Sequence, residues 1–169
     1  MQRSRENGHE HRRSFETKQR KPKRRNWKSS DAKDTQQRDS AMKHFTGRII
    51  KSGQCKGPAL VSPVPLSFFG GVDAATGIIV EPGHPLYGQG VAGRVLVFPT
   101  AKGSTVGSYI LYRLKKAGLA PVGIVNAESE PIVAVGAIIA DIPMVDRVDI
   151  TQIQTGDWVT IDGASVGVQ

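Results

Sequence analysis

The chain has 169 residues, enough for one domain with a hydrophobic core, and its single cysteine, Cys55, excludes an internal disulfide and a cysteine-rich metal site. Its net charge of +8 is uneven, since residues 1–41 hold 13 Lys and Arg against 6 Asp and Glu, while residues 42–169 hold 10 against 9. No run approaches the roughly 18 apolar residues of a membrane-spanning helix, so we expect a cytoplasmic protein.

Residues 1–41 form a basic N-terminal tail with almost no aliphatic side chains. Such a tail cannot bury enough apolar surface to offset the entropy of ordering it, so we expect it to be disordered and residues 42–169 to fold. Within it, Lys18–Lys28 offers Arg and Lys for phosphate backbones and Trp27 as a stacking face. A solvated extension and a nucleic-acid-binding segment both remain open interpretations.

The folded part begins with β-branched segments that predict a small β-rich layer. Residues 45–52 and 59–62 read as strands, separated by a turn over residues 53–57. The pair Gly70-Gly71 follows two aromatic residues and is expected on a loop. Residues 81–93 hold two prolines and four glycines, which predicts an exposed loop or one covered by a partner.

From Arg94 the pattern alternates between apolar strands and helical periodicity, and a turn at residues 155–157 then leads to a closing strand, 158–161. A β-α-β-α-β order of this kind predicts a parallel sheet in an α/β fold, with functional sites at the carboxyl ends of the strands. The expected elements are strand 94–98, helix 104–117, strand 122–125, helix 131–140 and strand 142–145.

The turn between the first of these strands and its helix is the segment most suggestive of chemistry. Lys102, Gly103, Ser104, Thr105 and Ser108 lie where a helix start offers unpaired N–H groups and a positive dipole end to an anion. The order of residues fits neither a P-loop nor a Gly-x-Ser-x-Gly nucleophile elbow. From these residues alone, Ser104 is either an N-cap or a stabilised serine base.

The four histidines do not have a spacing typical of metal ligands, so we expect no metal site in this chain. His9 and His11 lie in the basic tail, and His84 lies in the Pro/Gly loop.

Three runs of the folded part resemble the small subunit, or swivel domain, of the aconitase X family. These runs are GPALVSPVPLSFFGGVDAATGIIV, HPLYGQGVAGRVLVFPTAKGSTVGSYILYRLKKAGLAP and EPIVAVGAIIADIPMVD. The resemblance implies a swivelling β/β/α domain, with a central parallel sheet and a β-rich layer. It also implies a heterodimer, or multiples of it, in which this domain closes over a large subunit that carries a [4Fe-4S] cluster.

Within that family, the GSTVGS and IPMVD elements resemble the small subunit of archaeal-type phosphomevalonate dehydratase, a lyase of the mevalonate pathway of isoprenoid biosynthesis. The resemblance implies that Ser104 is the proton acceptor. A relative that acts on cis-3-hydroxy-L-proline is the alternative, because substrate choice is expected to rest largely on the large subunit. The expected substrate-binding residues are Lys102, Gly103, Thr105, Ser108, Gly70 and Gly71.

Overall fold

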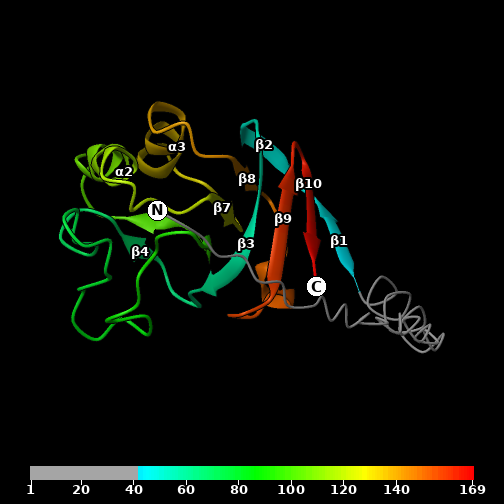
Figure 1. Ribbon diagram of the computed structural model, residues 1–169, viewed down its shortest axis with the longest axis horizontal. Coiled ribbons are helices and arrows are strands. Elements are labelled where there is room, and N and C mark those ends of the chain that lie inside the picture. The colour runs from blue at the N-terminus through cyan, green and yellow to red at the C-terminus, as the bar shows by residue number, and fades with distance from the viewer. Residues whose placement is uncertain (1–41) are drawn as a thin grey trace, which may run out of the picture.

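The computed structural model describes residues 42–169, and the expectations for residues 1–41, including His9 and His11, lie outside the described residues. In the described part, one eight-stranded sheet and one two-stranded sheet are accompanied by two α-helices (Figure 1). The elements are β1 (Lys43–Thr46), β2 (Arg48–Lys51), β3 (Gln54–Val61), β4 (Leu66–Ser67), β5 (Val95–Phe98), β6 (Ala101–Lys102), α2 (Gly107–Lys116), β7 (Gly123–Asn126), α3 (Pro131–Ile139), β8 (Met144–Asp146), the 3₁₀ turn η1 (Ile150–Gln152), β9 (Trp158–Asp162) and β10 (Ser165–Val168).

The expected β-α-β-α-β order is confirmed. Strands β3, β5, β7 and β8 lie side by side and run parallel, and α2 and α3 connect the last three of them. Parallel neighbours need such crossover connections, because a short hairpin can join only antiparallel strands. Figure 1 shows both helices gathered on one side of this sheet. The α/β class with a β-rich layer, expected from the sequence, is therefore correct.

The β-rich layer is built differently from the prediction. The segment 45–52 is two strands rather than one, and the predicted turn over residues 53–57 is mostly the beginning of β3. Strand β1 pairs with β10 at one edge of the large sheet, and β2 pairs with β8 at the other. A single residue, Gly47, connects β1 to β2. Only glycine fits there, because a Cβ would lie 2.3 Å from the Asp146 carbonyl oxygen. The sheet therefore curls until its edges meet.

Two hydrophobic cores lie on opposite faces of the parallel strands. Along β5 the side chains alternate, so that Leu96 and Phe98 face the helices while Val95 and Val97 face the layer formed by β9 and β10. The hairpin of β9 and β10 closes this second core, and β10 was missing from the sequence prediction. Strand β5 is thus held on both faces, which fixes the position of the turn that follows it.

The loop over residues 81–93 is not simply exposed. His84 is buried, its Nδ1 accepts a hydrogen bond from the Leu86 backbone N–H, and its Nε2 lies 3.4 Å from the Ser62 hydroxyl. Leu86 and Val91 are buried in the core beneath the helices. The composition of the loop does not predict this burial, because its prolines and glycines indicate only turns. The side chains of His84, Leu86 and Val91 point inward and anchor the loop. None of the helices between residues 42 and 169 is long and apolar enough to cross a membrane.

Candidate functional site

Ser104 lies at the carboxyl end of the parallel strands, as expected, but not inside the helix. Helix α2 begins at Gly107 and its N-cap is Val106, and it is preceded by a bend at Gly103 and a turn at residues 105–106. The Ser104 hydroxyl accepts a hydrogen bond from the Val106 N–H at 3.3 Å, a local bond of the kind with which serine competes against helical geometry. The predicted helix start at residue 104 is therefore wrong by three residues, and Ser104 is not the N-cap.

The exposed Ser104 side chain is available for chemistry. Among residues 42–169, its hydroxyl proton is donated to no other group, and the backbone N–H groups of Ser104 and Thr105 donate no hydrogen bond. These donors lie just before the N-terminus of α2, where the helix dipole also favours negative charge. The turn can thus stabilise an anion or an alkoxide.

The strand pair β4 and β6 brings the predicted glycines to the predicted lysine. Ser67 of β4 pairs with Lys102 of β6, which places the turn at Gly70-Gly71 beside Gly103. A hollow of about 330 Å³ lies between these segments. Its lining consists of Ser67, Phe69, Gly70, Gly71, Glu81, Lys102 and Gly103.

Two of the glycines are required by close packing around Ser67. A Cβ on Gly71 would lie 2.1 Å from the Ser67 carbonyl oxygen, closer than any real contact. A Cβ on Gly103 would lie 2.8 Å from the Ser67 Oγ, and the φ of +98° at Gly103 disfavours other residues as well. The two glycines therefore allow the turn at Gly70-Gly71 and the turn after β6 to pack closely around Ser67.

Glu81 is the functional candidate that sequence reasoning missed. Its Oε1 lies 2.6 Å from the Lys102 Nζ, and its Oε2 is buried without a hydrogen-bond partner in residues 42–169. A signal was present in the sequence, because Asp73 and Glu81 are the only acidic residues between Met42 and Ala127. The Pro and Gly residues that follow Glu81 indicate only a turn, and do not show that Glu81 meets Lys102.

Ser108 and Thr105 lie on a different side of the turn from the hollow. Ser108 is buried, and its hydroxyl donates a 2.8 Å hydrogen bond to the Ile132 carbonyl oxygen at the start of α3. This contact gives Ser108 a packing role, and its contact with substrate stays a prediction. Thr105 is exposed and borders a groove between α2 and α3. Helix α3 begins as predicted, with Pro131 in its first turn and the Glu130 carboxylate accepting from two backbone N–H groups.

Buried contacts hold the turn after β5 in place. The Asn126 side-chain amide donates to the Phe98 carbonyl oxygen at 2.7 Å, and the Glu128 N–H donates to the Pro99 carbonyl oxygen. The rings of Phe68 and Phe98 pack edge to face at 6.0 Å. Ser104 is therefore presented by a rigid frame, which is what a catalytic group requires.

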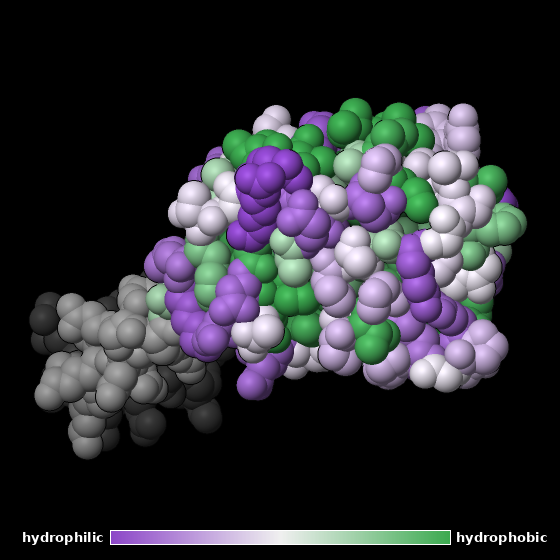
Figure 2. Space-filling view, turned by 180° about the vertical axis from the view of Figure 1, so that it is seen from behind, coloured by the Kyte–Doolittle hydropathy of each residue, from purple (hydrophilic) through white to green (hydrophobic). Residues whose placement is uncertain are grey.

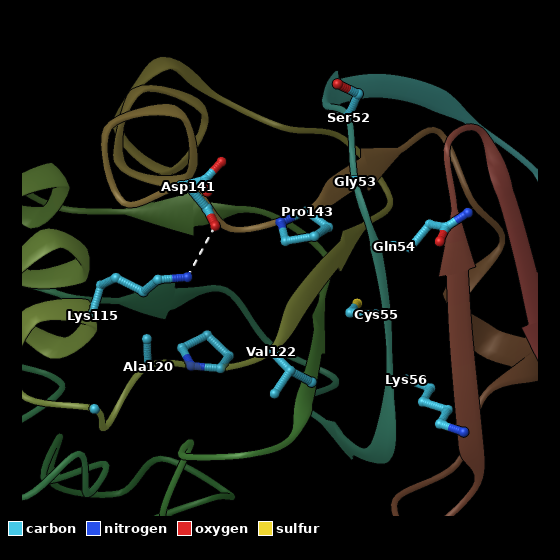
Figure 3. A pocket seen from close by; sticks show the side chains of 12 residues that line it. Ser52, Gly53, Gln54, Cys55, Lys56, Lys115, Ala120, Val122, Asp141 and Pro143 are labelled. Atoms are coloured by element: carbon cyan, nitrogen blue, oxygen red, sulfur yellow. Dashed lines mark hydrogen bonds between the residues drawn. The ribbon is translucent and has the colours of Figure 1, made fainter.

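Another hollow, of about 670 Å³, lies at the opposite end of the parallel strands, where they begin (Figure 3). It includes Cys55, Lys115 and Asp141, and Lys115 donates to the Asp141 carbonyl oxygen. Burial raises the pKa of Cys55 to about 11, so its thiol stays protonated at neutral pH and is a poor nucleophile. Residues 42–169 contain no group of three His, Cys, Asp or Glu side chains that could hold a metal ion.

Comparisons with known proteins agree with this geometry. The family described as "Aconitase X swivel domain" matches residues 44–169. A phosphomevalonate dehydratase small subunit from Methanocella arvoryzae is 55% identical over 122 residues, covering 70% of this chain and 92% of the relative. One with the same name from Thermococcus kodakarensis is 52% identical over 123 residues, covering 73% and 92%.

Solved structures lead to the same family. The crystal structure of Thermococcus kodakaraensis aconitase X in its holo form matches with a TM-score of 0.74 and 49% identity, covering 75% of this chain and 98% of that one. A solution NMR structure of a UPF0107 protein matches with a TM-score of 0.69 and 45% identity, covering 75% and 99%. The chain belongs to the aconitase X swivel-domain family.

Proposed function

We propose that this chain is the small subunit of a heteromeric phosphomevalonate dehydratase. The enzyme converts (R)-5-phosphomevalonate to trans-anhydromevalonate 5-phosphate and water, a hydro-lyase step of the mevalonate pathway. Named small subunits of this enzyme are 51% to 55% identical to the chain. The observation that carries the proposal is the exposed Ser104 at the start of α2, held beside Lys102 and Gly103 on a rigid frame.

Ser104 acts as the proton acceptor in this proposal. Its alkoxide takes a proton from the carbon next to the substrate carboxylate, the freed electron pair forms the carbon–carbon double bond, and the neighbouring hydroxyl leaves as hydroxide. The proton held by Ser104 then passes to that hydroxide, which gives water and restores the alkoxide. A serine alkoxide is a strong base that needs stabilisation to exist near neutral pH. The free N–H groups at Ser104 and Thr105 and the α2 dipole supply that stabilisation. The Lys102 ammonium, two residues before Ser104, adds positive charge that the paired Glu81 carboxylate offsets in part.

The anionic groups of the substrate are assigned to the hollow beside Ser104. Lys102 provides a positive charge there, and Gly103, Gly70 and Gly71 leave the backbone accessible. Thr105 borders the groove between α2 and α3 rather than the hollow, and offers a second hydroxyl on the other side of the turn. We assign Ser108 to holding the turn rather than to contact with substrate, because its buried hydroxyl donates to the Ile132 carbonyl oxygen. It instead keeps α2 against α3, and so the turn in position.

The metal chemistry is assigned to the partner. A [4Fe-4S] cluster needs several thiolate ligands, and this chain has one cysteine, so its own residues do not fit such a group. When bound by the large subunit, the cluster would supply Lewis-acid activation of the leaving hydroxyl. The contribution of this chain is then the base and the anion site. We assign the reaction to the cytoplasm. A substrate with phosphate and carboxylate charges is retained inside the cell, because it does not cross a bilayer unaided.

The test is anaerobic co-expression with the large subunit, followed by parallel assays with (R)-5-phosphomevalonate and cis-3-hydroxy-L-proline. Turnover of the phosphorylated acid, detected as the new double bond, is the expected result. The cognate large subunit alone serves as the control, because it lacks the Ser104 base. Turnover of hydroxyproline without phosphomevalonate turnover would reject the proposed substrate while keeping the proposed chemistry.

A further inference from the structure

Helix α3 is apolar on both of its faces. Val133, Gly136 and Ala137 are buried against the sheet and α2, whereas Val135, Ile138 and Ile139 are 47%, 51% and 42% exposed. The helix carries no charged residue from Pro131 to Ala140. A helix that is hydrophobic all round is normally buried, so the outer face of α3 is suited to burial by another surface.

This outer face continues across the neighbouring helix. Val106 and Tyr109 of the α2 region are 43% and 65% exposed, and a groove of about 390 Å³ runs between the two helices. Figure 2 shows apolar side chains at the top of the molecule, including the region where α3 lies. We call this surface the α2–α3 face. Its members are Val106, Tyr109, Val135, Ile138 and Ile139, and Thr105, Pro131 and Ile132 border the groove.

One end of the α2–α3 face adjoins the candidate catalytic turn. Thr105, which lines the groove, directly follows Ser104 in the chain. A subunit that brings a substrate and a metal cluster to Ser104 must approach this end of α2. The large subunit would therefore approach beside the groove.

We propose that the α2–α3 face is where the large subunit docks, with an uncharged, aliphatic surface of the partner covering α3 and filling the groove. The inference rests on the proposed function, because it takes the large subunit as the partner and Ser104 as the residue that the partner must reach. The tail of this chain is a poor occupant, because residues 1–41 hold 19 charged residues and an apolar groove offers them no counter-charge. Contact between two copies would compete with the approach of the large subunit at Thr105.

The experiment compares lysine substitutions on exposed positions of the full chain, co-expressed with a tagged large subunit. Val135→Lys, Ile138→Lys and the double variant place charge on the α2–α3 face while keeping good helix propensity. Trp158→Lys is the matched control, because Trp158 is 46% exposed but lies on β9, away from the helices. Thermal unfolding of each small-subunit variant alone verifies that the exposed substitutions leave the fold intact.

The expected result is that the double variant binds the large subunit about 100-fold more weakly, as for loss of central interface contacts, while the control binds normally. Assembly of the double variant at wild-type affinity would overturn the proposal. A second outcome would also overturn the proposal. In it, the wild-type small subunit forms a dimer by itself, and the double variant is monomeric but still binds the large subunit. Ser104→Ala separates the two proposals, because it is expected to assemble normally whether or not Ser104 is the base.

Discussion

The Lys102 Nζ lies 2.6 Å from the Glu81 Oε1, and both residues line the hollow beside the turn that carries Ser104. The pair joins β6 to a loop 21 residues earlier in the chain, and so fixes a side chain that would otherwise sample many rotamers. Both groups keep contact with solvent, with Lys102 49% and Glu81 24% exposed, so the pair contributes little to stability. The ion pair instead fixes where the Lys102 ammonium lies, two residues before the proposed base Ser104.

Lys102→Met is expected to raise KM for the phosphorylated substrate about 10- to 100-fold, because a hydrogen bond to a charged group is lost. Steady-state kinetics of the assembled enzyme measure this. Lys116→Met, at the other end of α2, is the control and should leave KM unchanged. An unchanged KM in Lys102→Met would remove Lys102 from the substrate site.

Gly71→Ala is expected to destabilise the domain by about 2 kcal/mol or more, since its Cβ would overlap the Ser67 carbonyl oxygen and force the β4 turn to move. Gly90→Ala is the matched control, because a Cβ there meets nothing within 4 Å and neither glycine has a positive φ. Urea unfolding of the two variants compares them directly. Equal stability would mean that the turn at Gly70-Gly71 is not tightly constrained.

Asp146 predicts the acid sensitivity of the fold. Burial alone would raise the pKa of its carboxyl, but hydrogen bonds from Arg48 and Ser129 outweigh burial and lower this pKa to about 2. Because the folded pKa lies below the unfolded value, the stabilisation is complete above about pH 4 and is lost as the pH falls toward 2. Asp146→Asn should cost about 2 kcal/mol at pH 7 and flatten stability between pH 4 and pH 2.

Urea unfolding at pH 7, 4 and 3 measures this dependence. Asp162→Asn, at an exposed position on β9, serves as the control for the removal of one carboxylate. A wild-type pH profile in Asp146→Asn would show that another group governs acid unfolding.

Deletion of residues 1–41 tests the nucleic-acid interpretation of the basic tail. Dehydratase activity of the shortened subunit is expected to equal that of the full chain, because every proposed site residue lies within residues 42–169. If the tail binds nucleic acid, the full chain should show an affinity that falls steeply with salt and disappears on truncation. Loss of dehydratase activity on truncation would instead give the tail a role in the enzyme.

The periodic part of the fold could be predicted from sequence, since its signals are local. Strand 95–98 alternates apolar residues between two cores, and Glu130-Pro131 provides the cap and first turn of α3. The start of α2 could not be placed, because Ser104 and Thr105 suit both a first helical turn and the non-helical turn that they form.

Long-range contacts account for the other errors. Nothing near Gly47 indicates that the strands on either side of it join opposite edges of one sheet. Likewise, the pairing of Glu81 with Lys102 and the burial of His84 depend on how a long loop folds back over the parallel strands. The resemblance to the family identified Ser104, whereas the ion pair beside it could be found only in the structure.

The catalytic role of Ser104 is tested most directly by the kcat of the assembled enzyme carrying Ser104→Ala, measured under anaerobic conditions. Ser165→Ala, an exposed serine at the start of β10, is the matched control and should turn over normally. The account predicts normal assembly of Ser104→Ala and a kcat lower by about 10²- to 10⁴-fold, the usual effect of losing a general base. Near-normal turnover by Ser104→Ala would contradict it.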